Sequence, residues 1–120
     1  MQGSTEDKNL DRIIRQTLID LGVPTHILGY KYMIEALHII IHEDKPCFIT
    51  KQVYAIIAEH NGTAVECVES ALRKTVRRIY QSNNTFFQEV MKSSSNDNVK
   101  QPSNSKFLTL LAERIKLAYH

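Results

Sequence analysis

The sequence contains few of the residues that interrupt or cross-link a chain. Its 120 residues include four glycines, three prolines, two cysteines and no tryptophan. The scarcity of glycine and proline argues against a fold built from many short strands and turns. Cys47 and Cys67 form no CxxC pair and have no metal-type spacing, so we expect two reduced thiols and neither a disulfide nor a cysteine-based metal site.

Long apolar runs are also missing. The longest candidate, "ALHIIIHEDKP" at residues 36–46, is interrupted by a histidine and ends in charged residues, so no membrane span is expected. The first residues, "MQGSTEDKN", lack the basic and apolar regions of a signal peptide. A cytoplasmic protein without membrane contact is therefore expected. Because no glycine-rich phosphate loop, paired-carboxylate site or nucleophile elbow appears, we expect neither an enzyme nor a cofactor.

The length and the charge set broad limits on the remaining classes. A chain of 120 residues is long enough to bury the core of one domain without disulfide or metal support. The net charge of +2 and the pI near 8.6 are only mildly basic. This balance permits nucleic-acid binding without arguing for it, so a binding surface would have to be a local basic patch.

Apolar residues recur at spacings of three and four, which predicts an all-α domain of six helices. Residues 1–9 are expected to form a flexible tail, and residues 10–120 the helical domain. The expected helices cover about residues 10–21, 26–42, 50–59, 63–80, 85–91 and 106–118. The second has the broadest apolar face and is predicted to be central. The apolar stripes also place Ile56, Val65 and Leu117 on inward faces.

Polar residues and glycines mark the expected helix ends. Gly22 can adopt the left-handed conformation that closes the first helix. The side chains of Thr50 and Thr63 are candidate N-caps for the third and fourth helices, and either Ser103 or Ser105 for the last. Between the third and fourth helices, Asn61 and Gly62 tolerate the positive φ of a tight turn.

The short third helix, the tight turn and the longer fourth helix have the sequence pattern of a helix-turn-helix at about residues 50–80. In such a unit the second helix lies in the major groove of DNA. Arg73 could contact a guanine edge and Glu69 could accept a hydrogen bond from a cytosine amine. Glu69 and Arg73 are also spaced i and i+4, however, so they could simply pair on a solvated helix face. Glu66 and Glu69 would in addition repel phosphates.

Two other groups of residues could carry chemistry. His38 and His42 are spaced i and i+4, with Glu35 one turn earlier, which is compatible with a metal site. Zinc requires three or four converging ligands, and no second cluster supplies them, so structural histidines and no metal are expected. Cys67 lies on the polar side of the fourth helix without an activating base and is expected to be an exposed or partly packed thiol.

Four stretches resemble one family. They are "LGVPTHILGYKYMIEAL" (residues 21–37), "IAEHNGTAVECVESALRKTV" (57–76), "RRIY" (77–80) and "QPSNSKFLTLLAERIKL" (101–117). They are similar to the C-terminal effector domains of the stage zero sporulation protein A family, and the likeness covers about residues 10–118. The patterns GVPxHIxGY and PxNSxF are its most specific parts.

The resemblance implies a six-helix domain that binds double-stranded DNA through a helix-turn-helix made by its third and fourth helices. Members bind a short box containing TGTCGAA, often as tandem head-to-tail domains, and activate or repress promoters. In activation they contact the housekeeping sigma factor of RNA polymerase. The resemblance thus implies DNA, a sigma factor and a homodimer or tandem dimer on DNA as partners. The family's N-terminal receiver domain has no counterpart here, so either a stand-alone protein or an excised effector domain is expected.

The family motif V-E-R-A-I-R in the recognition helix corresponds to residues 68–73. Glu69 and Arg73 match its base-reading residues, whereas Ser70 replaces its first arginine. The residues expected to contact bases are Glu69, Ser70 and Arg73. The residues expected to contact phosphates are Lys51, Lys74, Arg77 and Arg78. Losing one bidentate arginine contact removes on the order of 1–3 kcal/mol of discrimination.

Two hypotheses follow from these matches and departures. The first is a sequence-specific transcriptional regulator of this family that reads its own target box. The second is an interaction protein of the same fold that has lost specific DNA reading and modulates a full-length regulator or a sigma factor. Ser70, Cys67 and Glu66, which replace or precede the family's basic residues, motivate the second.

Overall fold

The computed structural model describes residues 5–42, 49–92 and 100–119. Within these ranges the chain forms six α-helices and one π-helical turn, and no strand. The elements are α1 (Thr5–Asp20), α2 (Leu28–His42), η1 (Ile49–Val53), α3 (Tyr54–Asn61), α4 (Val65–Ser82), α5 (Thr85–Met91) and α6 (Asn104–Tyr119). The prediction of an all-α, six-helix fold is confirmed. Cys47 lies outside the described residues.

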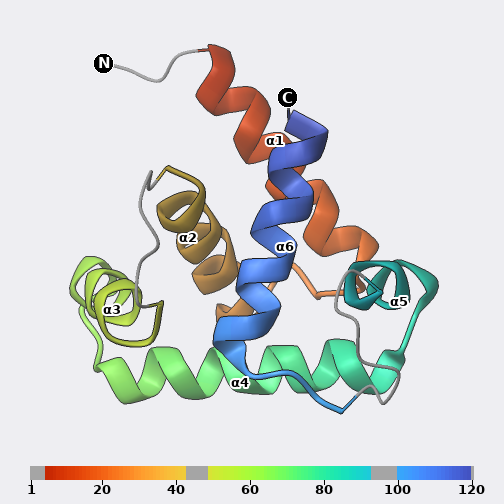
Figure 1. Ribbon diagram of the computed structural model, residues 1–120. Coiled ribbons are helices and arrows are strands. Elements are labelled where there is room, and N and C mark those ends of the chain that lie inside the picture. The colour runs from red at the N-terminus through yellow and green to blue at the C-terminus, as the bar shows by residue number, and fades with distance from the viewer. Residues whose placement is uncertain (1–4, 43–48, 93–99, 120) are drawn as a thin grey trace.

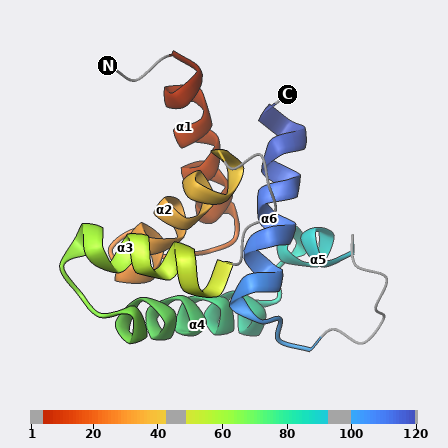
Figure 2. The same ribbon diagram turned by 60° about the vertical axis from the view of Figure 1, so that its left-hand side comes forward.

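The helices surround α2, which packs against α1, α3, α4 and α6, so its predicted central position is confirmed. In Figure 1, α4 runs along one side of the molecule, with α3 near its N-terminal end and α5 near its C-terminal end. α1 and α6 rise away from α4 on the opposite side, as the turned view in Figure 2 also shows. The core is built from apolar side chains of all six helices, among them the neighbouring rings of Phe87 and Phe107.

Several helix ends form as the sequence predicts. Gly22 has a φ of 86° and closes α1, with the Val23 amide donating to the Leu18 carbonyl. α5 covers the predicted residues and is capped by the Asn84 side chain, which accepts a hydrogen bond from the Phe87 amide. The hydroxyl of Ser103, rather than that of Ser105, caps α6 by accepting from the Lys106 amide.

Other boundaries differ from the predictions. α1 begins at Thr5, so residues 5–9 are helical rather than a tail, and residues 1–4 lie outside the described chain. No glycine or proline in residues 5–9 stops the helix. Thr50 does not cap α3, because helical backbone already begins at Ile49 and the N-cap of α3 is Val53. Thr63 does not cap α4 either: Ala64 is the N-cap, without a side-chain hydrogen bond.

The predicted burial of three apolar side chains is also corrected. Ile56 is 49% exposed, because the inward stripe of α3 consists of Tyr54, Ile57 and Ala58. Leu117 is 82% exposed in the last turns of α6, which end at the edge of the molecule in Figure 1. Val65 is 38% exposed because it lies in the first turn of α4. A helical period identifies a stripe but does not tell how far the neighbouring helix extends along it.

Candidate nucleic-acid interface

α3 and α4 are joined by a three-residue turn and pack directly on each other. Gly62 has a φ of 63° and ends α3 in the left-handed conformation. The Thr63 amide donates to the Ala58 carbonyl at 2.9 Å, and the Gly62 amide donates to the Glu59 carbonyl at 3.3 Å. These two bonds are those of a Schellman motif, which reverses the chain with little freedom. The predicted tight turn is therefore present, with Gly62 as the residue of positive φ.

A carboxylate of α2 holds the end of α3 in place. Glu35 accepts hydrogen bonds from Nδ2 of Asn61 at 3.0 and 3.2 Å, and it pairs with Nδ1 of His60 at 2.9 Å. The Asn61 amide also donates to the Ile57 carbonyl. Because the Glu35 side chain is only 19% exposed, its bonds to Asn61 are partly sheltered from water and hold the turn against α2, whereas the His60 side chain is exposed.

The inner face of α4 is buried along its length. The buried side chains of α4 are Val68, Leu72, Thr75, Val76 and Ile79. α2 crosses this face so closely that a Cβ atom on Gly29 would lie 1.7 Å from Oγ1 of Thr75. The Thr75 hydroxyl donates to the Ala71 carbonyl at 2.8 Å. The outer face of α4 is thus carried on a rigidly seated helix.

The outer face of α4 carries most of the residues that were predicted from the sequence to contact DNA. Arg73 and Glu69 lie half-exposed, and Nη1 of Arg73 is 3.2 Å from Oε2 of Glu69. Ser70 is partly buried beside them. The remaining cations of this face, Lys74, Arg77 and Arg78, are exposed, and Lys51 is exposed separately in η1 before α3. The two side chains therefore pair with each other and also face outward.

One residue that sequence reasoning missed links the three helices at this surface. Asn104, at the start of α6, is only 9% exposed, and its Nδ2 donates to the Tyr54 hydroxyl at 3.0 Å and to the Glu69 carbonyl at 3.2 Å. Burial raises the pKa of Tyr54 above its usual value, so the hydroxyl stays protonated. The signal available in the sequence was a polar Asn inside the block "PSNSK", where an apolar stripe begins.

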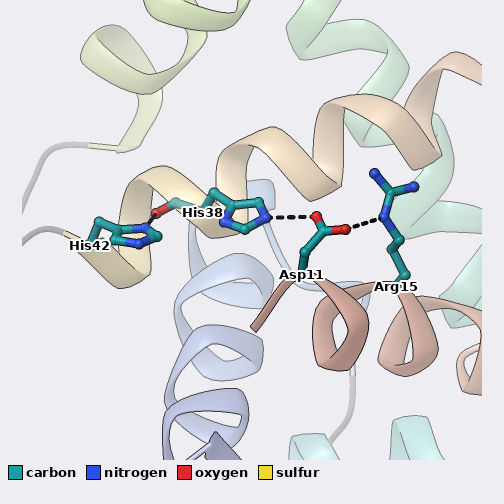
Figure 3. Close-up of polar contacts among 4 residues, drawn as sticks. All are labelled: Asp11, Arg15, His38 and His42. Atoms are coloured by element: carbon teal, nitrogen blue, oxygen red, sulfur yellow. Dashed lines mark hydrogen bonds and ion pairs between the residues drawn. The ribbon is translucent and has the colours of Figure 1, made fainter. Parts of the chain in front are cut away.

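The residues considered for a metal do not converge. His38 Nε2 is 2.9 Å from Oδ1 of Asp11, whose other oxygen accepts from Arg15 at 2.6 Å, as Figure 3 shows. His42 Nδ1 lies 2.7 Å from the His38 carbonyl, and Glu35 faces the end of α3 instead. Partial burial tends to raise the pKa of Asp11, but the bonds from His38 and Arg15 outweigh it and leave that pKa below its usual value. Among the residues that the structure describes, no group of three or more candidate ligands is placed to hold a metal.

Cys67 is an exposed thiol on α4, as predicted. In the described ranges, no helix combines the length and the apolar character that crossing a bilayer requires. A comparison with protein families adds one finding. The family model described as "Sporulation initiation factor Spo0A C terminal" matches residues 14–115, which include every described helix in whole or in part.

Proposed function

Because this chain belongs to the family of sporulation initiation factor Spo0A C-terminal domains, we propose that it is a sequence-specific DNA-binding regulator of transcription. In this proposal α3 and α4 act as a helix-turn-helix, with α4 in the major groove and α3 across the backbone. One observation carries it: α4 buries one face along its length and presents Arg73 on the other, beside Glu69. A rigid helix with outward donors is what base reading requires.

The pairing of Arg73 with Glu69 does not prevent base contact. An exposed i, i+4 ion pair contributes about 0.3–0.5 kcal/mol, whereas a bidentate arginine–guanine contact contributes about 1–3 kcal/mol of discrimination. The guanidinium can therefore turn to a guanine, and Glu69 is then free to accept from a cytosine amine. Ser70 offers only a hydroxyl, which bonds to several bases, so we expect a target box that differs from TGTCGAA at the position read by the missing arginine.

The other cations would contact the sugar–phosphate backbone. Lys74, Arg77 and Arg78 are exposed further along α4, and Lys51 is exposed just before α3. Contacts of this kind fix the register of the protein on the duplex and carry no base information. They also make affinity fall steeply with salt, because each neutralised phosphate releases counterions.

The test is a selection of bound duplexes from a random pool, followed by titrations of the selected box with three variants. Arg73→Ala should weaken binding of that box by about 5- to 150-fold and relax the preference at one base pair. Arg77→Ala should weaken all duplexes alike and lower the slope of log affinity against log salt by about 1. Arg12→Ala, which removes an exposed arginine of α1, is the control and should leave both unchanged. Equal loss on the selected box and on scrambled DNA for Arg73→Ala would refute the assignment.

A second candidate function is an interaction protein that keeps the fold without reading DNA. Glu66 is exposed in the first turn of α4, where it would repel phosphate, and Ser70 stands where the family motif has an arginine. Such a protein would bind a full-length regulator or a sigma factor instead. A mobility-shift titration at moderate salt distinguishes the two, because equal affinity for every duplex favours the interaction protein.

A further inference from the structure

An open cleft of about 780 Å³ lies between the N-terminal half of α4 and the chain that leads into α6. The wall formed by α4 consists of Val65, Glu66, Glu69 and Arg73. The opposite wall is formed by residues 101–105, and Tyr54 also lines the cleft. In Figures 1 and 2 the start of α6 lies beside α4. Two of the three base-reading residues of the proposed function, Glu69 and Arg73, therefore share a cleft with a segment far away in the sequence.

This segment is held at a fixed distance from α4. The buried amide of Asn104 bonds to the Glu69 carbonyl and the Tyr54 hydroxyl, so one side chain ties the start of α6 to both α4 and α3. Pro102 is buried, and the Ser103 hydroxyl caps the first turn of α6. Residues 102–104, which carry these anchors, are already ordered before a ligand arrives, which lowers the entropic cost of binding.

The charged side chains around the cleft are unevenly distributed, with two lysines at the ends of its α6 side and both carboxylates on its α4 side. Lys100 and Lys106 flank the segment and are exposed, and Gln101 and Ser103 between them expose further hydrogen-bonding groups. The sequence from Lys100 to Ala112 contains no carboxylate. The α4 wall instead carries two carboxylates, Glu66 and Glu69, together with the guanidinium of Arg73. A phosphate would thus meet only cations and neutral groups on the α6 side, whereas on the α4 side two carboxylates face one guanidinium.

We propose that residues 100–106, termed the α6 approach segment, form a second DNA-contacting element that binds the phosphates flanking the groove occupied by α4. An α-helix with its side chains is about 10–12 Å across, and the major groove is about 12 Å wide. A helix that fills the groove therefore brings the element packed beside it over the neighbouring backbone strand. Lys100 and Lys106 neutralise phosphates there, while Gln101 and Ser103 donate hydrogen bonds. The inference rests on the proposed function, which it extends from α3 and α4 to α6.

The segment also gives Glu66 and Glu69 a consistent position. With phosphates held by the α6 approach segment, the two carboxylates face the interior of the groove, where cytosine amines are donors. In this arrangement Lys100 and Lys106 would lie at the phosphates, while Glu66, Glu69 and Arg73 would lie at the base edges. The segment contributes affinity without base preference, because phosphates carry no sequence information.

The experiment compares two double variants of the full chain by fluorescence anisotropy, on the selected box and on scrambled duplex, between 50 and 200 mM salt. Lys100→Ala/Lys106→Ala removes the two flanking cations. The matched control, Lys8→Ala/Arg12→Ala, removes two exposed cations from the half of α1 that projects away from α4 in both views. Because all four side chains are exposed, both variants should keep the wild-type Tm.

We expect Lys100→Ala/Lys106→Ala to bind both duplexes more weakly and to lower the salt slope by about 1.8, at about 0.9 for each phosphate contact. When the salt concentration rises fourfold, the affinity of the wild type should therefore fall by a factor about ten times larger than the affinity of this variant. The preference of the variant for the box should be unchanged. A slope equal to that of the control overturns the inference, while the effect of Arg73→Ala then still supports the proposed function. If the wild-type chain binds no duplex, both are overturned.

Discussion

The close crossing of α2 and α4 at Gly29 gives the sharpest prediction about how α4 is seated. A Cβ atom at this position would lie 1.7 Å from Oγ1 and 2.9 Å from Cβ of Thr75, and 3.2 Å from the Ala71 carbonyl oxygen. Rotating Thr75 away would relieve only the first contact and would break its 2.8 Å bond to Ala71. In Gly29→Ala the two helices must therefore move apart.

The size of the effect is the difference between two opposing contributions. Alanine is a better helix former than glycine by about 1 kcal/mol, which favours the variant. Overpacking of a close contact costs about 1–3 kcal/mol, and a clash this short belongs at the upper end. The net loss in the free energy of unfolding should be about 2 kcal/mol. For a domain of this size that corresponds to a fall in Tm of about 5–10 °C.

The assay is urea unfolding of a double-mutant cycle made of Gly29→Ala, Thr75→Ala and the double variant. Removing the hydroxyl and methyl of Thr75 opens space for the new Cβ, so the cost of Gly29→Ala should shrink by about 1 kcal/mol or more in that background. The DNA affinity of folded Gly29→Ala should also be lower than that of the folded wild type, because α4 is displaced. Wild-type stability for Gly29→Ala, or a cost independent of residue 75, would refute the reasoning.

Two further predictions concern the turn and the pH dependence. Gly62→Ala should lower the free energy of unfolding by about 1 kcal/mol, because the left-handed conformation costs an L-residue about 1–2 kcal/mol. Gly62→Asn should lower it by less, since asparagine tolerates this conformation better. Equal urea midpoints for the wild type and both variants would contradict this prediction. The pKa of Asp11 is lowered in the folded state, so its contribution is present above the unfolded value of 3.8 and is lost as pH falls through the folded value. Wild type should therefore exceed Asp11→Asn in stability at pH 7, and the difference should close in acid. A difference that is constant with pH would argue against the stabilising contacts of Asp11 with His38 and Arg15.

The sequence allowed the helices and most of the candidate site to be predicted because local signals dominate there. Gly22 and Gly62 mark their turns because they adopt a backbone conformation that few other residues tolerate, and α5 begins and ends at the predicted residues. The exposure of Arg73 follows from its position opposite a strong apolar stripe. These features depend on residues close together in the chain.

The features that could not be predicted depend on contacts between distant segments. Ile56 and Leu117 follow a helical period, yet both side chains are exposed, since no other segment within residues 5–42, 49–92 and 100–119 covers them. Asn104 acts 35 residues away from Glu69 and 50 away from Tyr54, and no local pattern links an asparagine at a helix start to those groups. The cleft beside α4 could not be predicted for the same reason.

The hydrogen bonds between Glu35 and the residues His60 and Asn61 have a consequence for protein engineering. The angle between α3 and α4 is partly set from outside the pair, by a carboxylate that belongs to α2. A graft of residues 49–82 into an unrelated scaffold would leave that carboxylate behind and lose the hydrogen bonds that hold His60 and Asn61. An experiment that exchanges binding preference between relatives should therefore transfer α2 together with α4, or should replace only outward-facing side chains of α4.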